Sequence, residues 1–326
     1  MGKESTQTKN GKAFEYAILK EFQEKLQRGT AVEVIENKAY ITAKKHFDSF
    51  GTLIQSEFSL YASFAVNFLI DIEPRLSNSF DDNDILQLEI LTDDKGKDGD
   101  VRDIVAIRLL QKWEIGVSAK NNHKAIKHSR LSNKIDFGKK WLGIPVSNIY
   151  FDEVKPIFDS LDKMRKESNK TKTWESLGDY HTSIYHPVLE AFKKELFKIY
   201  NTNPAKVAST LVEYLIGNKD FYKVIKSKHN IEIQAYNLHG TLNLPFKEII
   251  PKFKIPQVNL PTKIISINYK KDTKTTLIIK LNNDWELSFR IHNASSRVEP
   301  SLKFDINLLK APKTLFTNKL SIKESK

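Results

Sequence analysis

The sequence predicts an α/β (α+β) fold, a mixed β-sheet core flanked by helices with a β-rich C-terminal region, and three observations support this class. Residues 9–29 carry apolar side chains at helical spacing. Residues 113–120 alternate apolar and polar side chains, as a half-buried strand does. Residues 263–291 contain three further alternating segments. With 326 residues and 40% hydrophobic content, the chain can bury a large core.

The N-terminal part of the chain is predicted to be mainly helical. The helix over 9–29 is expected to begin with Asn10 as its cap. Residues 30–84 are expected to form further helices, including an aromatic-rich one at 47–70. A strand at 86–91 and a polar turn then lead into the central part of the chain.

The central segment 101–120 predicts a β-hairpin that turns near residue 111. Because strands joined by a short turn pair antiparallel, the start of the first strand lies beside the end of the second. This register brings Asp103 close to Lys120. Residues 121–136, which are rich in lysine, are predicted to continue from the hairpin as a basic helix.

The second half of the chain changes from helical to β-rich character. Helices are expected at 154–173, 186–200 and 204–216, and strands at 146–151, 221–244, 263–269, 275–281 and 285–291. We therefore place a domain boundary after residue 216, which gives segments 1–216 and 217–326. A single compact domain is the alternative.

Composition excludes several classes of protein. The chain has no cysteine, which rules out disulfides, thiolate catalysis, Fe–S clusters and cysteine-based zinc sites. No apolar run reaches the roughly 18 residues that span a bilayer. Residues 1–10 are polar and lack the apolar segment of a secretory signal. We therefore expect a cytoplasmic protein without membrane association.

Positive charge is concentrated in two regions. The formal net charge is +12, of which residues 121–140 carry +5 and residues 247–326 carry +9. A coding bias towards lysine is the alternative explanation, but it would not leave the rest of the chain slightly acidic. Two separate basic regions are typical of a protein that binds a polyanion.

The expected pair of Asp103 and Lys120 has the chemistry of a phosphodiesterase. A carboxylate at the start of one strand and an ammonium at the end of its neighbour can hold a divalent cation and a water against a phosphate. The alternative is a surface ion pair worth less than about 1 kcal/mol. The basic regions around the pair favour the catalytic interpretation.

A second metal-binding carboxylate is not evident from the hairpin. Such sites usually carry an acid two residues before the lysine, but Ser118 stands there. Glu114 lies roughly 20 Å along the strand from Lys120, too far to share a metal. The remaining candidates are Glu15, Asp100 and Asp136. Glu15 is the first choice, although a charge favourable to the helix dipole explains it equally well.

Two groups of polar side chains are candidates for DNA contact. The first follows the hairpin and consists of Asn122, His123, Lys124, His128 and Arg130. The second lies in segment 290–306, where Arg, Asn, Ser and Lys side chains can reach base edges. Its members are Arg290, His292, Asn293, Ser295, Ser296, Arg297 and Lys303.

Three stretches carry a resemblance to a known family. They are GKAFEYAILKEF from Gly11, the block GDVRDIV…WEIGVSAKNNHKAIKHSRLS from Gly99, and WELSFRIHNASSRVEPSLKFDI from Trp285. Together they span nearly the whole chain, and the second is the most specific. The chain resembles the type II restriction endonucleases of the HaeIII kind, which belong to the broader PD-(D/E)xK nuclease group.

The resemblance implies a restriction-endonuclease-like fold, with a nuclease core in 1–216 and a DNA-recognition region in 217–326. By position, Glu15 matches the helix acid, Asp103 the strand aspartate, and Lys120 the lysine of the (D/E)xK element. Ser118 departs from the pattern at the (D/E) position. The second carboxylate therefore stays open between Glu15, Asp100 and Asp136.

The resemblance also implies a Mg²⁺-dependent endonuclease that cuts both strands of DNA within a short palindrome, GGCC by likeness. Twofold symmetry in the target favours a homodimer, and a companion methyltransferase is expected to protect the same site. Because Ser118 weakens the site, a non-catalytic sequence-specific DNA-binding protein is the alternative. An RNA-binding or RNA-cleaving protein is a third reading, without an RRM or GxxG signature to support it.

Overall fold

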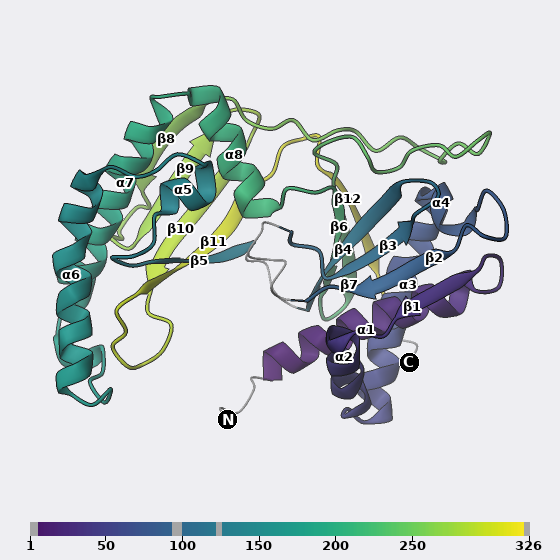
Figure 1. Cartoon of the computed structure of the whole chain (residues 1–326), viewed down its shortest axis with the longest axis horizontal. Helices are drawn as coiled ribbons and strands as arrows, with labels where there is room; N and C mark the ends of the chain where they lie inside the picture. Colours follow the sequence, from purple (N-terminus) through teal and green to yellow (C-terminus); the bar gives the residue numbers. More distant parts are fainter. Residues whose placement is uncertain (1–5, 93–99, 122–125, 323–326) are drawn as a thin grey trace. The chain divides into compact units, whose positions relative to one another are not determined.

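The computed structural model describes residues 6–92, 100–121 and 126–322, and these form two compact units (Figure 1). Unit 1 consists of Met1–His123, Gly217–Val258 and Thr314–Lys326, and unit 2 of Lys124–Ile216 and Asn259–Lys313. The chain thus enters unit 2 twice and returns to unit 1 twice. One of these crossings falls after residue 216, and the division into segments 1–216 and 217–326 stays a prediction.

Unit 1 contains a seven-stranded mixed sheet with the strand order β1-β2-β3-β4-β6-β7-β12. The pairs β1–β2 and β4–β6 are parallel and the others antiparallel. The strands are β1 (Val32–Ile35), β2 (Leu86–Ile90), β3 (Ile104–Arg108), β4 (Trp113–Asn121), β6 (Phe221–Lys226), β7 (Asn230–Tyr236) and β12 (Phe316–Ser321). The mixed sheet expected from the sequence is confirmed, while β1 was missed among the expected helices.

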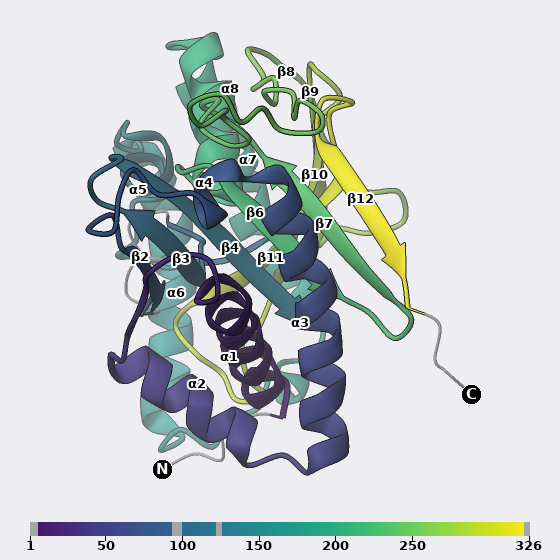
Figure 2. The ribbon, with the colours of Figure 1, turned by 90° about the vertical axis from the view of Figure 1, so that its right-hand side faces the viewer.

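Helices α1 (Thr6–Leu26) and α3 (Thr52–Ile72) lie against one face of this sheet, as Figure 2 shows. Helix α2 (Lys38–Asp48) packs beside α1, and the short α4 (Pro74–Ser77) follows α3. The side chains of Phe14, Ile18 and Phe22 on α1 are almost fully buried in this core. The face of the sheet that α1 covers is therefore apolar.

Helix α3 is long and apolar enough, by length and composition alone, to cross a bilayer. Its buried residues Phe58, Tyr61, Ala62, Ala65, Val66 and Leu69 form one stripe in the core of unit 1. The Tyr61 hydroxyl also donates a hydrogen bond to the Lys228 carbonyl (2.6 Å). These contacts are those of a helix that packs against a sheet.

Unit 2 contains a five-stranded antiparallel sheet with the order β5-β11-β10-β9-β8. Its strands are β5 (Lys127–Leu131), β8 (Ile264–Tyr269), β9 (Thr276–Leu281), β10 (Glu286–His292) and β11 (Leu302–Lys310). Its helices are α5 (Phe137–Leu142), α6 (Asn148–Glu167), α7 (His186–Tyr200) and α8 (Pro204–Ile216), with short turns η2 (Glu175–Leu177) and η3 (His181–Tyr185). Phe192 of α7 packs against Phe289 and Phe304 of the sheet.

Three sequence-based assignments are wrong. Within the basic helix expected over 121–136, residues 127–131 instead form β5, because they pair with β11, far away in the sequence; residues 122–125 lie outside the described residues. The strand expected at 146–151 is the start of α6, where buried Tyr150, Val154, Phe158 and Leu161 recur at helical spacing. Helix α1 begins at Thr6, so Asn10 lies inside it rather than at its cap.

A fully buried carboxyl group, that of Glu73, joins α3 to β6. Its Oε1 accepts hydrogen bonds from the Tyr222 hydroxyl (2.5 Å) and the Asn243 amide (2.7 Å). Its Oε2 has no partner among the described residues. Burial, opposed by these hydrogen bonds, raises the pKa of Glu73 to about 7.

The variant Glu73→Gln is expected to change how stability depends on pH. Because the folded pKa lies above the unfolded one, the stabilising contribution of Glu73 is present below about pH 4.5 and is lost as the pH rises through about 7. Relative to wild type, the variant should gain up to about 3 kcal/mol of unfolding free energy between pH 5 and pH 8. Urea unfolding at both pH values measures this gain, and an equal difference at both would contradict it.

Candidate active site

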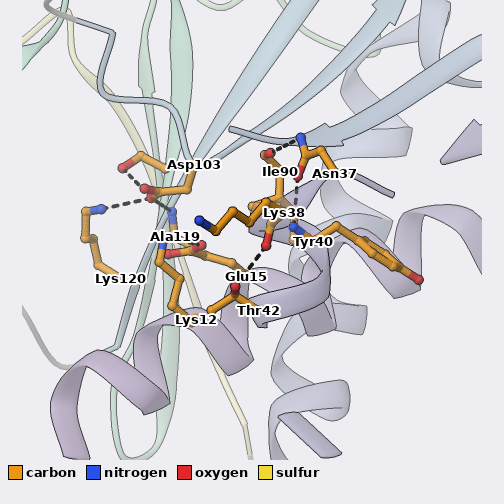
Figure 3. Close-up of polar contacts among 11 residues, drawn as sticks. Lys12, Glu15, Asn37, Lys38, Tyr40, Thr42, Ile90, Asp103, Ala119 and Lys120 are labelled. Atoms are coloured by element: carbon orange, nitrogen blue, oxygen red, sulfur yellow. Dashed lines mark hydrogen bonds and ion pairs between the residues drawn. The ribbon is translucent and has the colours of Figure 1, made fainter. Parts of the chain in front are cut away.

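The centre of the site is the carboxylate of Asp103, which lies just before β3. Its Oδ2 accepts a hydrogen bond from Ser118 Oγ (3.2 Å). It also accepts from the Ala119 amide (2.8 Å) and from Lys120 Nζ (2.9 Å), as Figure 3 shows. The hairpin register causes this arrangement, because Ile104 pairs with Val117 and the Asp103 amide donates to the Val117 carbonyl. The proximity of Asp103 and Lys120 expected from the sequence is confirmed, and their catalytic roles stay a prediction.

The pair of Asp103 and Lys120 is open to solvent. The side chains are 20% and 28% exposed, so a phosphate can approach both. As an ion pair alone, such a contact contributes at most about 1 kcal/mol to stability. Ser118, at the position of the missing acid, orients the Asp103 carboxylate with its hydroxyl.

Glu15, on α1, is the second carboxyl group of the site. It is only 6% exposed, and its Oε2 accepts a hydrogen bond from Lys12 Nζ (3.1 Å). Burial and then the negative charge of Asp103 raise the pKa of Glu15 to about 8, although Lys12 and Lys120 oppose the shift. Two carboxyl groups and two ammonium groups thus act on one another here, and Figure 3 shows Lys12 and Glu15 on α1 beside the strand residues.

The other two candidates for the second carboxylate are occupied by structural contacts. Asp100 receives Nε and Nη2 of Arg102 at 2.9 and 2.8 Å. Burial by itself would raise the pKa of Asp100, but the hydrogen bonds and charge of Arg102 outweigh burial and hold this pKa below its usual range. Asp136 belongs to unit 2, where its Oδ1 caps α5 by accepting the Lys139 and Val146 amides. The negative charge of Asp103 acts on Glu15, where it helps to raise the pKa of the carboxyl group.

Sequence reasoning missed a lysine of the same sheet, Lys223 on β6. It is 6% exposed, and its Cα partner across the sheet is Ser118. Burial and the positive charge of Lys120 lower the pKa of Lys223 to about 8. The signal available in the sequence was a lysine between Tyr222 and Val224, in a strand that is otherwise largely apolar.

The acidic side chains fit a hard divalent cation. Within the described residues, no three His, Asp or Glu side chains are grouped as a complete metal site. The negative charge of Asp103 nevertheless helps to raise the pKa of Glu15, and a bound cation relieves such repulsion between carboxylates. Carboxylate oxygens completed by water are the ligands that Mg²⁺ prefers, so these two residues suit such an ion.

The first group of expected DNA contacts is only partly described. Asn122, His123 and Lys124 lie outside the described residues, and His128 belongs to β5. Arg130, also on β5, donates from Nη1 to Ser301 Oγ (2.9 Å) and lies 3.3 Å from Glu299 Oε2.

The second group lies in unit 2 at one end of its sheet. Arg290 and His292 are on β10 and Lys303 on β11, so the expected loop shortens to residues 293–301. His292 pairs with Lys303, which pairs with Arg130 on the next strand. The structure therefore brings together side chains from both predicted groups.

The loop itself is held by contacts with the segment that precedes α7. Trp174 Nε1 donates to the Arg297 carbonyl (2.9 Å), and the Trp174 amide donates to the Ser296 carbonyl (3.1 Å). The Tyr185 hydroxyl donates to Asn293 Oδ1 (3.1 Å), and Ser295 Oγ donates to the Arg297 carbonyl (3.0 Å). These contacts fix the backbone of the loop at Ser296 and Arg297 within unit 2.

Comparisons with known proteins show relatives over most of the chain. A family model described as HaeIII restriction endonuclease matches residues 11–312. The chain is 40% identical over 308 residues to the Type II restriction enzyme HaeIII of Haemophilus aegyptius. The aligned residues cover 94% of this chain and 95% of the relative. No solved structure matches the chain significantly.

Proposed function

The chain belongs to the HaeIII restriction endonuclease family, and we propose that it is a type II site-specific deoxyribonuclease that hydrolyses both strands of duplex DNA. The observation that carries this proposal is the contact of Lys120 Nζ with Asp103 Oδ2 at 2.9 Å, beside the buried Glu15. A non-catalytic DNA-binding protein is not favoured, because the aspartate and lysine are both in place despite Ser118.

The mechanism follows from the positions of these side chains. Asp103 and Glu15 would hold Mg²⁺, which when bound supplies Lewis-acid stabilisation of the developing phosphorane charge and the leaving 3′ oxygen. Lys120 orients or deprotonates the attacking water. The Ser118 hydroxyl and the Ala119 amide fix the Asp103 carboxylate, so its geometry needs little reorganisation during the reaction.

We also propose a target sequence, an oligomeric state and a partner enzyme. The target is a short palindrome, GGCC by likeness to the family, and a homodimer provides one active site for each strand. Side chains of unit 2 around Arg130, Arg290, Arg297 and Lys303 contact the DNA. A companion methyltransferase protects the same sequence in the cytoplasm of the host.

Incubation with plasmid DNA, with and without Mg²⁺, tests the function. Discrete fragments should form only when the metal is present, because the two carboxyl groups need a cation to act together. Sequencing of the fragment ends gives the target and the cut position. Methylated plasmid serves as a matched control and should stay intact. A mobility shift without fragments would instead identify a DNA-binding protein.

A further inference from the structure

One lysine of unit 1 is largely buried without an ion-pair partner. Lys223 is 6% exposed, and within the described part of the chain its Nζ makes no hydrogen bond and no ion pair. Its Nζ is not among the fully buried polar atoms that lack a partner, so the ammonium reaches solvent while the rest of the side chain is covered. Burial disfavours the charged form of such a lysine, and an anion that arrives from solvent would favour it again.

The position of Lys223 follows from the register of three strands. Ser118 lies opposite Lys223, and Lys223 opposite Gln234, while the Ser118 hydroxyl donates to Asp103 Oδ2. Directly opposed residues of a sheet point to the same face, so these side chains form one polar row. The other face at β6 is apolar, with Tyr222 and Val224 in the core.

The neighbours of Lys223 in this row are already engaged. Gln234 Nε2 donates to Glu232 Oε1 (2.7 Å), and its Oε1 accepts the Tyr236 hydroxyl (3.1 Å). Asp103 Oδ2 accepts from Lys120, Ser118 and Ala119. The positive charge of Lys120 disfavours the charged form of Lys223, whereas the negative charges of Asp103 and Glu232 favour that form. The row therefore holds two ammonium groups close to a single aspartate.

We propose that Lys223 is a second phosphate-binding lysine of the active site, whose ammonium contacts a non-bridging oxygen of the DNA backbone beside the phosphate that is cut. This inference rests on the proposed nuclease function. A phosphate oxygen is an anionic acceptor, and it enters from solvent on the face where the Asp103 and Lys120 side chains are exposed. Its arrival supplies the missing counter-charge, and because charge increases in the transition state, the contact accelerates cleavage.

The variant Lys223→Gln tests this contact by two measurements. Its single-turnover cleavage rate at saturating DNA should fall roughly 100-fold. With Ca²⁺ in place of Mg²⁺, its plot of log affinity against log salt concentration should lose about 0.9 from the slope, the amount expected for one phosphate contact. Lys223→Arg, which keeps the charge, should retain the slope.

Lys226 provides a matched control on the same strand. It is also 6% exposed, but its Nζ is paired with Glu57 (2.7 Å) and it belongs to the opposite face. Lys226→Gln should lower the melting temperature and leave the cleavage rate and the salt slope unchanged. Lys223→Gln and Lys223→Met should instead melt at or above the wild-type temperature, because they remove an unpaired charge.

The outcomes separate this inference from the proposed function. Unchanged cleavage and an unchanged slope in a folded Lys223→Gln would overturn the phosphate contact while the wild type still cuts DNA. A parallel loss of stability and activity in Lys223→Gln, Lys223→Met and Lys223→Arg would show a structural lysine and also overturn it. A wild type that does not cut would refute the nuclease, and the salt slope would still decide whether Lys223 binds phosphate.

Discussion

Lys120→Ala is expected to lower the rate of DNA cleavage by roughly 10³-fold while specific binding to duplex DNA is retained. The substitution removes the ammonium that contacts Asp103 Oδ2 and that acts on the attacking water. It leaves the strand backbone and the side chains of unit 2 in place. Single-turnover cleavage and a mobility-shift titration on the same DNA measure the two effects separately.

Lys44→Ala is the matched control for this variant. Lys44 forms a pair with Asp48 at 2.8 Å, nearly the same length as the pair of Lys120 with Asp103, but on the surface of α2. Its loss should change cleavage less than twofold, because this pair lies outside the site, and it should cost at most about 1 kcal/mol of stability. Near-normal cleavage by Lys120→Ala would remove Lys120 from the chemistry.

Asp103→Asn is expected to abolish cleavage, with a loss of at least about 10³-fold. The carboxylate accepts three hydrogen bonds on one oxygen, and asparagine removes the negative charge while keeping the shape. The variant should also lose divalent-metal binding. Isothermal titration with Ca²⁺ measures the binding, and cleavage assays over a range of Mg²⁺ concentrations measure the activity.

Asp48→Asn gives the corresponding control, since it removes an exposed aspartate from a lysine pair outside the site. It should bind metal and cut DNA as the wild type does. If Asp103→Asn kept metal affinity and activity, the cation would have to be held by other side chains, and the assignment of Asp103 would be wrong.

The sequence predicted the hairpin because its determinants are local. A four-residue connection, 109–112, joins β3 to β4. The register of the two strands places Asp103 beside segment 118–120, where the Lys120 side chain reaches it. Helices α1, α7 and α8 were likewise evident, because each shows its buried stripe within its own residues. Such features are formed by residues that are close in the sequence, which is why short sequence patterns predict them.

The other features depend on contacts between distant segments. Residues 127–131 form a strand because β11 supplies their hydrogen-bond partners. The basic composition of this segment does not predict that pairing. Lys223 reaches the polar row because β6 pairs parallel with β4, about a hundred residues earlier in the chain. Glu15 was the first choice for the second carboxylate and also matched the family pattern, whereas the contact of Asp100 with Arg102 could not be seen without coordinates.

The order in which the ribosome makes these segments has a consequence for expression. Strand β12 forms the outer edge of the first sheet by pairing with β7, which is synthesised some eighty residues earlier. A nascent chain that has not reached Phe316 presents the bare amides and carbonyls of β7, a template for association with other chains. Premature stop codons before this point should therefore yield insoluble polypeptide, and no single cut of the gene separates the two halves of the molecule into independently produced pieces.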